Sequence, residues 1–324
     1  MNAGPVTSNT IPATMMALRA HSRGGPEVLV YEEAPRPHPG RDEISVAVRA
    51  AAITFAELTW PETWESRGVD RTPIIPSHEF AGVVAEVGSG VTDFARGDSV
   101  FGLVPFNRDG AAAEFVVVPS AYAAVKAASV SDADAAAAVL PALTAWEALR
   151  DHVDLAAGQR LLIRGATGGV GAFVTQFAHG IGAEVTAIVT SASGEARATQ
   201  LGADHVLVIA RGSQPSDLNG FDAAIDAAGA DVPEWMYAAL RPGGQLIVLQ
   251  EPPSQTLADK YGVRATFFVV GTSRERLQEL AALLAAGNVQ VAVAQTIPLS
   301  EGKAAYESGS LPMPAPGKTV LLVG

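Results

Sequence analysis

The sequence predicts an α/β protein that combines a compact β barrel with a doubly wound parallel sheet of six strands. Three features support this prediction. Short apolar segments separated by turn residues fill residues 1–126, and strands alternate with helices from residue 160 onward. The alternation begins with a glycine-rich turn that joins an apolar strand to an amphipathic helix.

The first part of the chain has the pattern of a barrel, with many short strands and stiff connections. Met1–Pro12 has the composition of a frayed tail, and Pro35–Gly40 contains three prolines that cannot donate ladder hydrogen bonds. Gly88-Ser89-Gly90 and Gly97-Asp98 mark further turns. The predicted strands are Met15–Arg19, Val28–Tyr31, Ile44–Ala50, Phe80–Val87, Ser99–Val104 and Glu114–Val118.

The pattern changes after Pro119. An alanine-rich helix is expected over Asp132–Arg150, and a second helix over Arg274–Ala286. The six strands of the parallel sheet are Leu161–Ile163, Glu184–Val189, His205–Ile209, Phe221–Ile225, Gln245–Leu249 and Ala265–Val270. Val289–Ile297 and Thr319–Val323 return to β character. We therefore expect a barrel domain at 1–126, a nucleotide-binding domain at 127–270 and a segment at 271–324 that rejoins the first domain.

The glycine-rich turn predicts a dinucleotide site. Its best match is Ala166-x-Gly168-x-x-Gly171, with alanine at the first glycine position of the usual fingerprint. A turn with almost no side chains lets a pyrophosphate reach free backbone N–H groups and the positive end of the helix dipole. A purely structural turn would show the same glycines. The predicted cofactor contacts here are Ala166, Thr167, Gly168, Gly169 and Val170.

Composition limits the class of partner. The 324 residues are 48% hydrophobic and 17% charged, which is enough apolar content for a sizeable core. A net charge of -12 disfavours nucleic acid, whose phosphates need a basic surface. The chain has no cysteine, residues 1–11 lack the pattern of a signal peptide, and the apolar stretch 133–149 is too short and interrupted to span a membrane. We expect a cytoplasmic protein with a small-molecule substrate and no membrane or nucleic-acid partner.

The cofactor preference is predicted from the end of the second strand of the parallel sheet. An NAD enzyme places an acid there to bind the ribose 2′-hydroxyl, but no acid precedes Glu195. Thr190, Ser191 and Ser193 offer hydroxyls, and Arg197 offers a fork that suits a phosphate. These could also be ordinary loop hydroxyls and a solvated arginine. We predict NADPH, because its 2′-phosphate needs donors and is repelled by a carboxylate.

Several segments together resemble a known family. They are HEFAGVVAEVGSGVTDFARGDSVFG at 78–102, GAAAEFVVVP at 110–119, PALTAWEAL at 141–149, GATGGVG at 165–171, LGADHV at 201–206, PGGQLIVL at 242–249 and GKTVLLV at 317–323. In this order the chain resembles the zinc-independent medium-chain dehydrogenase/reductase proteins of the quinone oxidoreductase-like branch. The resemblance implies a GroES-like catalytic domain, a Rossmann domain, an active site in the cleft between them and a homodimer.

The resemblance also suggests that no metal is bound. Zinc-dependent relatives carry a cysteine where this chain has Thr54, and a four-cysteine lobe where it has the short loop Phe106–Gly110. His78 and Glu79 alone do not form the three-ligand open site of a catalytic zinc.

Family position assigns the remaining candidates. Thr54 is expected to donate to the substrate, and Glu57 to lie on the substrate side, although the family pattern often has asparagine and aspartate there. Thr144 would contact the nicotinamide, or bond back to its own helix. Gln250, after the strand Gln245–Leu249, is included among the cofactor contacts.

Two further assignments stay open. His78 is a candidate catalytic acid, since imidazole titrates near neutrality, but a histidine beside a glutamate also suits a structural pair. Trp60 and Trp64 lie in the aromatic stretch WPETW. They either wall the site of a flat substrate or pack over the barrel.

The resemblance therefore implies an NADPH-dependent enoyl or quinone reductase, which transfers a hydride to an α,β-unsaturated carbonyl or a quinone. A specialised biosynthetic step would have the same sequence signature. The alternatives are an alcohol or carbonyl dehydrogenase, which lacks an obvious substitute for zinc here, and an NADPH-binding redox sensor without turnover.

Overall fold

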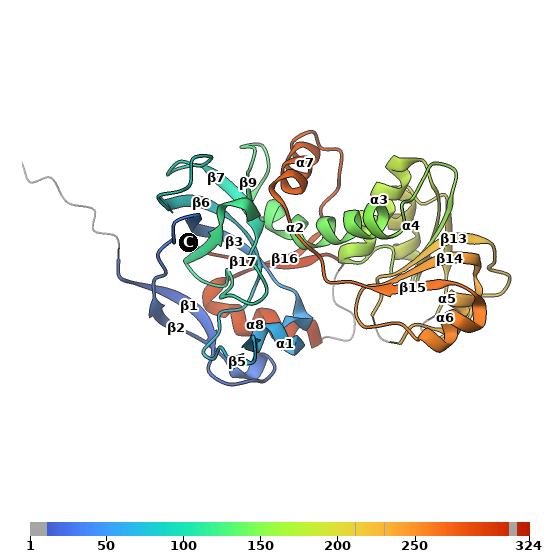
Figure 1. The fold of residues 1–324 in the computed structure, drawn as a ribbon, viewed down its shortest axis with the longest axis horizontal. Helices are drawn as coiled ribbons and strands as arrows, with labels where there is room; N and C mark the ends of the chain where they lie inside the picture. The colour runs from blue at the N-terminus through green and yellow to red at the C-terminus, as the bar shows by residue number, and fades with distance from the viewer. Residues whose placement is uncertain (1–11, 211, 230, 311–315) are drawn as a thin grey trace, which may run out of the picture.

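The computed structural model describes residues 12–210, 212–229, 231–310 and 316–324. They form two lobes that lie side by side, a β domain with strands from both ends of the described chain and an α/β domain from its middle (Figure 1). All of the predicted tail except Pro12 lies outside these ranges. Within them, no helix is both long and apolar enough to cross a membrane.

A seven-stranded sheet forms most of the β domain. Its order is β16-β17-β3-β6-β7-β9, with β8 also paired to β3. β17 runs antiparallel to β3 with Val320 opposite Ala52, so the last strand lies within the first lobe. Alternating residues such as Ile44, Val46 and Phe80 fill its core. The strands are β3 (Glu43–Ala52), β6 (Glu79–Val87), β7 (Ser99–Leu103), β8 (Phe115–Pro119), β9 (Ala123–Val125), β16 (Val293–Pro298) and β17 (Lys318–Leu322).

Two strand pairs complete this lobe. β1 (Thr14–Ala20) pairs with β2 (Leu29–Pro35), and β4 (Glu65–Ser66) pairs with β5 (Val69–Asp70). The predicted strand Val28–Tyr31 is therefore longer and ends in the first residue of the proline-rich connector. Proline is tolerated there because it stands at the end of the strand.

The α/β domain contains the predicted doubly wound sheet, whose six strands are all parallel. The strand order is β12-β11-β10-β13-β14-β15. The chain adds β11 and β12 on one side of β10 and the later strands on the other, and such sheets bind ligands at this switch point between β10 and β13. The strands are β10 (Arg160–Arg164), β11 (Glu184–Val189), β12 (His205–Val208), β13 (Phe221–Asp226), β14 (Leu240–Val248) and β15 (Arg264–Phe267).

Helices cover both faces of this sheet (Figure 1). Along β10, Leu161 and Ile163 face one side and Leu162 faces the other, which explains the continuous apolar run in the sequence. One face packs against α2, α3 and α7, and the other packs against α5 and α6. The helices are α2 (Asp132–Trp146), α3 (Gly169–Ile181), α4 (Ala192–Gln200), α5 (Glu234–Ala238), α6 (Gln255–Tyr261) and α7 (Arg274–Ala285).

The alanine-rich helix α2 lies between the lobes (Figure 1). Ser131 caps it by accepting a hydrogen bond from the N–H of Asp134. The predicted helix extended to Arg150, but from Glu147 to His152 the chain is a π-helix instead. Its last bond runs five residues back, from the N–H of Val153 to the carbonyl of Ala148.

The loop after β15 departs from the prediction. Phe268 to Val270 were expected to continue the strand, but they leave the sheet. Glu147 of the π-helix accepts a hydrogen bond of 2.9 Å from the N–H of Gly271, and the ring of His152 lies 4.3 Å from that of Phe268. These contacts turn the loop toward the other lobe.

Candidate active site

A cleft of about 580 Å³ opens at the carboxyl edge of the parallel sheet, where it faces the β domain. The loops that follow β10, β13, β14 and β15 form one side of it. The other side is a segment of the β domain, residues 53–62, here called the wall segment. Of the predicted site residues, the cleft is lined by Thr54, Trp60, Thr144, Gly169, Val170 and Gln250.

The glycine turn has the shape that a pyrophosphate needs. Gly165 has φ +80°, and a Cβ on Gly171 would lie 2.0 Å from the carbonyl oxygen of Gly165, so neither position accepts a side chain. The space beside Gly168 and Gly169 is open, since a Cβ there would meet nothing closer than 3.4 Å and 4.0 Å. The N-terminus of α3 therefore presents free backbone to the cleft, and the residues fit a dinucleotide phosphate.

Of the four residues predicted to bind a 2′-phosphate, three lie at the start of α4 and Arg197 lies in its last turn, and none of them lines the cleft. Ser191 caps this helix, and its Oγ lies 3.0 Å from Oγ of Ser193. Thr190 is exposed beside them. Arg197 follows one turn later, and its buried Nε has no hydrogen-bond partner among the described residues. A buried guanidinium nitrogen without a partner is a donor that an anion can satisfy.

The position of Thr144 is compatible with both roles considered for it. Its Oγ1 donates to the carbonyl of Leu140 at 2.7 Å, as a helical threonine commonly does, and the side chain also lines the cleft. Ala166, by contrast, is completely buried in the turn. Among the predicted cofactor contacts, Thr144 therefore lines the cleft, whereas the side chain of Ala166 helps to pack the turn.

Thr54 lies in an ionic cluster that sequence reasoning did not find. Nζ of Lys318 lies 2.5 Å from Oε2 of Glu79 and donates to Oγ1 of Thr54 at 2.8 Å. The other carboxylate oxygen of Glu79 accepts from the N–H of Leu140 in α2 at 3.1 Å. Burial raises the pKa of Glu79, and the Lys318 ammonium opposes that shift. The cluster places one positive charge on the floor of the cleft.

His78 does not line the cleft. Its ring is 3% exposed, packs edge-on against Phe106 at 5.1 Å, and neither nitrogen has a hydrogen-bond partner among the described residues. Burial lowers the pKa of His78 to about 3, so the imidazole is neutral at physiological pH. In this environment it suits a structural role better than that of a proton donor.

Glu57 is also buried, at 1% exposure, and is not among the cleft residues. The hydroxyl of Tyr306 donates to its Oε1, and the N–H of Ser77 donates to its Oε2 at 2.9 Å. Burial raises the pKa of Glu57 to about 7. The acid that was expected on the substrate side thus belongs to the wall segment, but its carboxyl group is buried against Tyr306 and Ser77 instead of lining the cleft.

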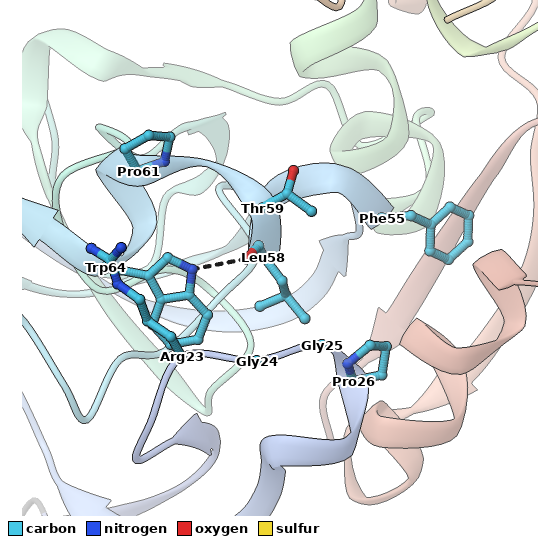
Figure 2. A pocket seen from close by; sticks show the side chains of 9 residues that line it. All are labelled: Arg23, Gly24, Gly25, Pro26, Phe55, Leu58, Thr59, Pro61 and Trp64. Atoms are coloured by element: carbon cyan, nitrogen blue, oxygen red, sulfur yellow. Dashed lines mark hydrogen bonds between the residues drawn. The ribbon is translucent and has the colours of Figure 1, made fainter. Parts of the chain in front are cut away.

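The two predicted tryptophans lie on different sides of the wall segment. Trp60 lines the cleft and packs edge-on against Phe106 at 5.3 Å. Trp64 is 3% exposed and lines a separate pocket of about 370 Å³, where its Nε1 donates to the carbonyl of Leu58 at 2.8 Å (Figure 2). Phe55 and Pro61 line both cavities.

This placement separates the effects expected from trimming each ring. Trp60→Ala should raise KM for a bulky substrate about tenfold, since a buried aromatic contact contributes on the order of 1–2 kcal/mol. Trp64→Ala should instead lower the unfolding free energy by about 3 kcal/mol and leave KM within about twofold. Steady-state kinetics and urea denaturation of both variants make the comparison, and equal KM effects would contradict it.

Three parts of the cleft were not predicted. Phe106 and the loop Phe267–Val270 give it an apolar surface, and Lys318 gives it a charge. Lys318 stands within the quoted segment GKTVLLV, but nothing in that segment marks the lysine as a site residue. Its contact with Thr54 spans 264 positions of the sequence.

Two known families match the chain. The alcohol dehydrogenase GroES-like domain family matches residues 40–129, and the zinc-binding dehydrogenase family matches residues 201–321. The mitochondrial NAD(P)H oxidoreductase RTN4IP1 of Mus musculus is 33% identical over 285 residues, which cover 78% of this chain and 71% of that protein.

Two other similarities extend the comparison. A mycocerosic acid synthase-like polyketide synthase of Mycobacterium tuberculosis is 34% identical over 191 residues, which cover 59% of this chain and 9% of the synthase. The structure of Escherichia coli quinone oxidoreductase complexed with NADPH superposes with a TM-score of 0.81 at 27% identity, covering 96% of this chain and all of the other.

The residues of this cleft fit zinc poorly, although one matching family is described as zinc-binding. Within the described ranges, no three His, Cys, Asp or Glu side chains gather closely enough to hold a metal. Thr54 replaces the thiolate expected of zinc-dependent relatives, and the Lys318 ammonium already pairs with Glu79. A cation bound beside Glu79 would have to displace that ammonium.

Proposed function

The chain belongs to the quinone oxidoreductase-like branch of the medium-chain dehydrogenase/reductase superfamily, and we propose that it is an NADPH-dependent reductase of electron-poor double bonds. Its substrates would be α,β-unsaturated carbonyl compounds or quinones. One observation carries this proposal. A single cleft combines an open glycine turn, an apolar wall and the ammonium of Lys318, which is among the residues that line it.

The dinucleotide would bind along the carboxyl edge of the parallel sheet. Gly168 and Gly169 would receive the pyrophosphate, and Thr144 and Gln250 would flank the nicotinamide. Bound NADPH supplies the hydride. The aromatic and aliphatic side chains of the wall segment and of Phe267–Val270 would exclude water and hold a flat, apolar substrate.

Lys318 and Thr54 would stabilise the negative charge that develops on the substrate oxygen. Reduction of an enone or a quinone leaves negative charge on the substrate oxygen, which needs a preorganised donor. The Lys318 ammonium has three N–H bonds, two of which meet Glu79 and Thr54. The third is available to an oxygen in the cleft. We propose this pair as the electrostatic catalyst, with Thr54 holding the ammonium in place.

The relatives support this class of reaction. The mouse relative is named as an NAD(P)H oxidoreductase, and the Escherichia coli structure is a quinone oxidoreductase with NADPH bound. The mycobacterial relative is named as a polyketide synthase, a biosynthetic enzyme, which keeps a substrate from a biosynthetic pathway within the proposal. The cytoplasmic location and the homodimer stay predictions.

A direct assay tests the proposal. Oxidation of NADPH should be measured at 340 nm with a panel of small quinones and a panel of enones and enoyl thioesters, with NADPH binding measured separately by fluorescence. Turnover of either panel supports the proposal. Binding without any turnover would favour the redox-sensor alternative, and activity confined to alcohols would favour a dehydrogenase.

The α4 site gives a prediction on cofactor choice. Arg197→Ala should weaken NADPH binding roughly tenfold, because a charge-assisted hydrogen bond contributes on the order of 1.5–3 kcal/mol, and NADH binding should hardly change. Ser191→Asp should shift the ratio of kcat/KM toward NADH. If the aspartate causes no shift, this loop is not the phosphate pocket. If Arg197→Ala alone has no effect, another base such as Arg211, which lies outside the described residues, binds the phosphate.

A further inference from the structure

The structure assigns a role to two buried side chains that the cleft does not contain. We propose that Tyr306 and Glu57 form a positioning pair, which holds the wall segment in the conformation that the substrate meets. Neither residue touches the substrate. The inference deepens the proposed function and rests on it, because the wall segment is the substrate side of the cleft.

Glu57 connects three parts of the β domain. Its side chain accepts from Tyr306 in α8 (Gly302–Glu307) and from the N–H of Ser77, which precedes β6. Its backbone carbonyl accepts from Oγ1 of Thr63 at 2.5 Å and from the N–H of Trp60 at 3.2 Å. The residue therefore ties the turn that carries Trp60 to α8 and to the entrance of β6.

Ser77 is held in a strained conformation that directs its N–H to Glu57. Its φ is +68°, a left-handed value that is uncommon for serine. Its Oγ donates to the carbonyl of Ala52 at 2.9 Å, and its own carbonyl accepts from the N–H of Ala111. A strained residue persists only where its surroundings over-determine it, which makes this donor a fixed point for the carboxylate.

The residues after α8 contact the wall segment at a second point. A Cβ on Gly309 would lie 2.4 Å from Cδ1 of Phe55, so the phenyl ring packs directly on the glycine backbone. Phe55 lines the cleft and appears beside the α8 region in Figure 2. Two contacts therefore fix the position of the wall segment relative to α8 and the residues that follow it. One is the polar contact with Tyr306, and the other is the apolar contact with Gly309.

The pair also responds to pH. The groups that face Glu57 are the Tyr306 hydroxyl, the Ser77 N–H and the His78 ring at 3.7 Å, with the charges of Lys318 and Glu79 acting at longer range. Burial raises the pKa of Glu57 to about 7 and that of Tyr306 well above its usual value, so the tyrosine remains the donor. A neutral carboxyl accepts weaker hydrogen bonds than a carboxylate. Substrate KM should therefore rise as the pH falls through about 7.

The test is Tyr306→Phe, which removes only the hydroxyl. Its KM for a bulky enone or quinone should rise about fivefold, with kcat and the NADPH dissociation constant within about twofold. The pH dependence of KM should move to higher pH, because the Tyr306 hydrogen bond lowers the pKa of Glu57. Incorporated 5-fluorotryptophan gives one resonance for each of the four tryptophans. The Trp60 signal, assigned with Trp60→Phe, should shift, and the Trp235 signal should not.

Matched variants separate positioning from general destabilisation. Ile44→Val removes one buried methyl from β3, in the core of the same domain. It should leave both KM and the Trp60 resonance unchanged. Glu57→Gln should reproduce the shift, since the amide keeps only one of the two oxygens that accept from Tyr306 and Ser77, and the double variant should add nothing further. An unshifted Trp60 signal in Tyr306→Phe overturns the inference. Because this signal requires no turnover, it decides the inference even if the proposed reaction fails.

Discussion

Gly171→Ala is expected to abolish productive NADPH binding and to destabilise the α/β domain. The added Cβ would lie 2.0 Å from the carbonyl oxygen of Gly165 and 3.0 Å from Cα of Ala166, and both are backbone atoms that cannot turn away. Helix α3 must then move away from the turn. A displacement of about 1 Å in such a site can cost about 100-fold in kcat/KM, and overpacking of this kind typically costs about 3 kcal/mol of unfolding free energy.

The same helix offers a matched control. A Cβ on Gly180 would meet no atom within 4 Å, so Gly180→Ala should keep NADPH affinity and gain up to about 1 kcal/mol from helix propensity. NADPH titration and urea denaturation of both variants make the comparison. Normal NADPH affinity in Gly171→Ala would show that the turn tolerates a side chain and that α3 does not approach the cofactor as proposed.

Lys318→Met is expected to lower kcat by about 100-fold or more while the fold is retained. Loss of one preorganised donor to a developing oxyanion typically costs a factor of about 100 to 1,000. The methionine keeps most of the apolar stem but leaves Glu79 without its counter-ion. Since burial already raises the pKa of Glu79, that carboxyl should take up a proton rather than remain charged.

A double variant distinguishes catalysis from packing. Lys318→Met combined with Glu79→Gln removes both charges, and the introduced amide oxygen can still accept from the N–H of Leu140. Thermal stability should approach that of the parent, while kcat should stay low. Recovery of kcat in the double variant would show that the ammonium serves only to neutralise Glu79. Because the side chain of Lys318 passes close to Gly169, NADPH affinity should be measured in parallel. It reports any loss of contact between the cofactor and this part of the turn.

The alternation of apolar segments predicted the fold well because the physics behind it is local. Leu161, Leu162 and Ile163 must be buried on both faces, and the turn after them requires glycine at Gly165 and Gly171, so strand, turn and helix follow from neighbouring residues. The prediction that the last strand of this sheet extends to Val270 was wrong, because its end depends on contacts that are distant in sequence. Phe268 has strand-like character, but contacts from a distant π-helix decide where it lies.

The site was predicted only where its residues are close in sequence. Trp60 and Trp64 look equivalent in a row of letters, and only the packing of a five-residue 3₁₀ turn, Phe55–Thr59, places them on opposite sides of the wall segment. The family resemblance implied that Glu57 lies on the substrate side, yet the turn directs its carboxyl group inward. Tyr306 does not stand out in the sequence, because the carboxyl group to which it donates lies 249 positions away.

The alanines of α2 bear on whether either lobe can fold by itself. Ala135 to Ala138 are all buried, and the core they belong to includes Ala50 and Phe101 of the β domain as well as Phe173 and Ile225 of the α/β domain. A unit that folds alone needs its own closed core. Here the small side chains let both lobes approach one helix so closely that they share the core around α2, although the β domain also has a separate core of its own. We therefore expect that separating either lobe from α2 would expose the apolar side chains of this shared core.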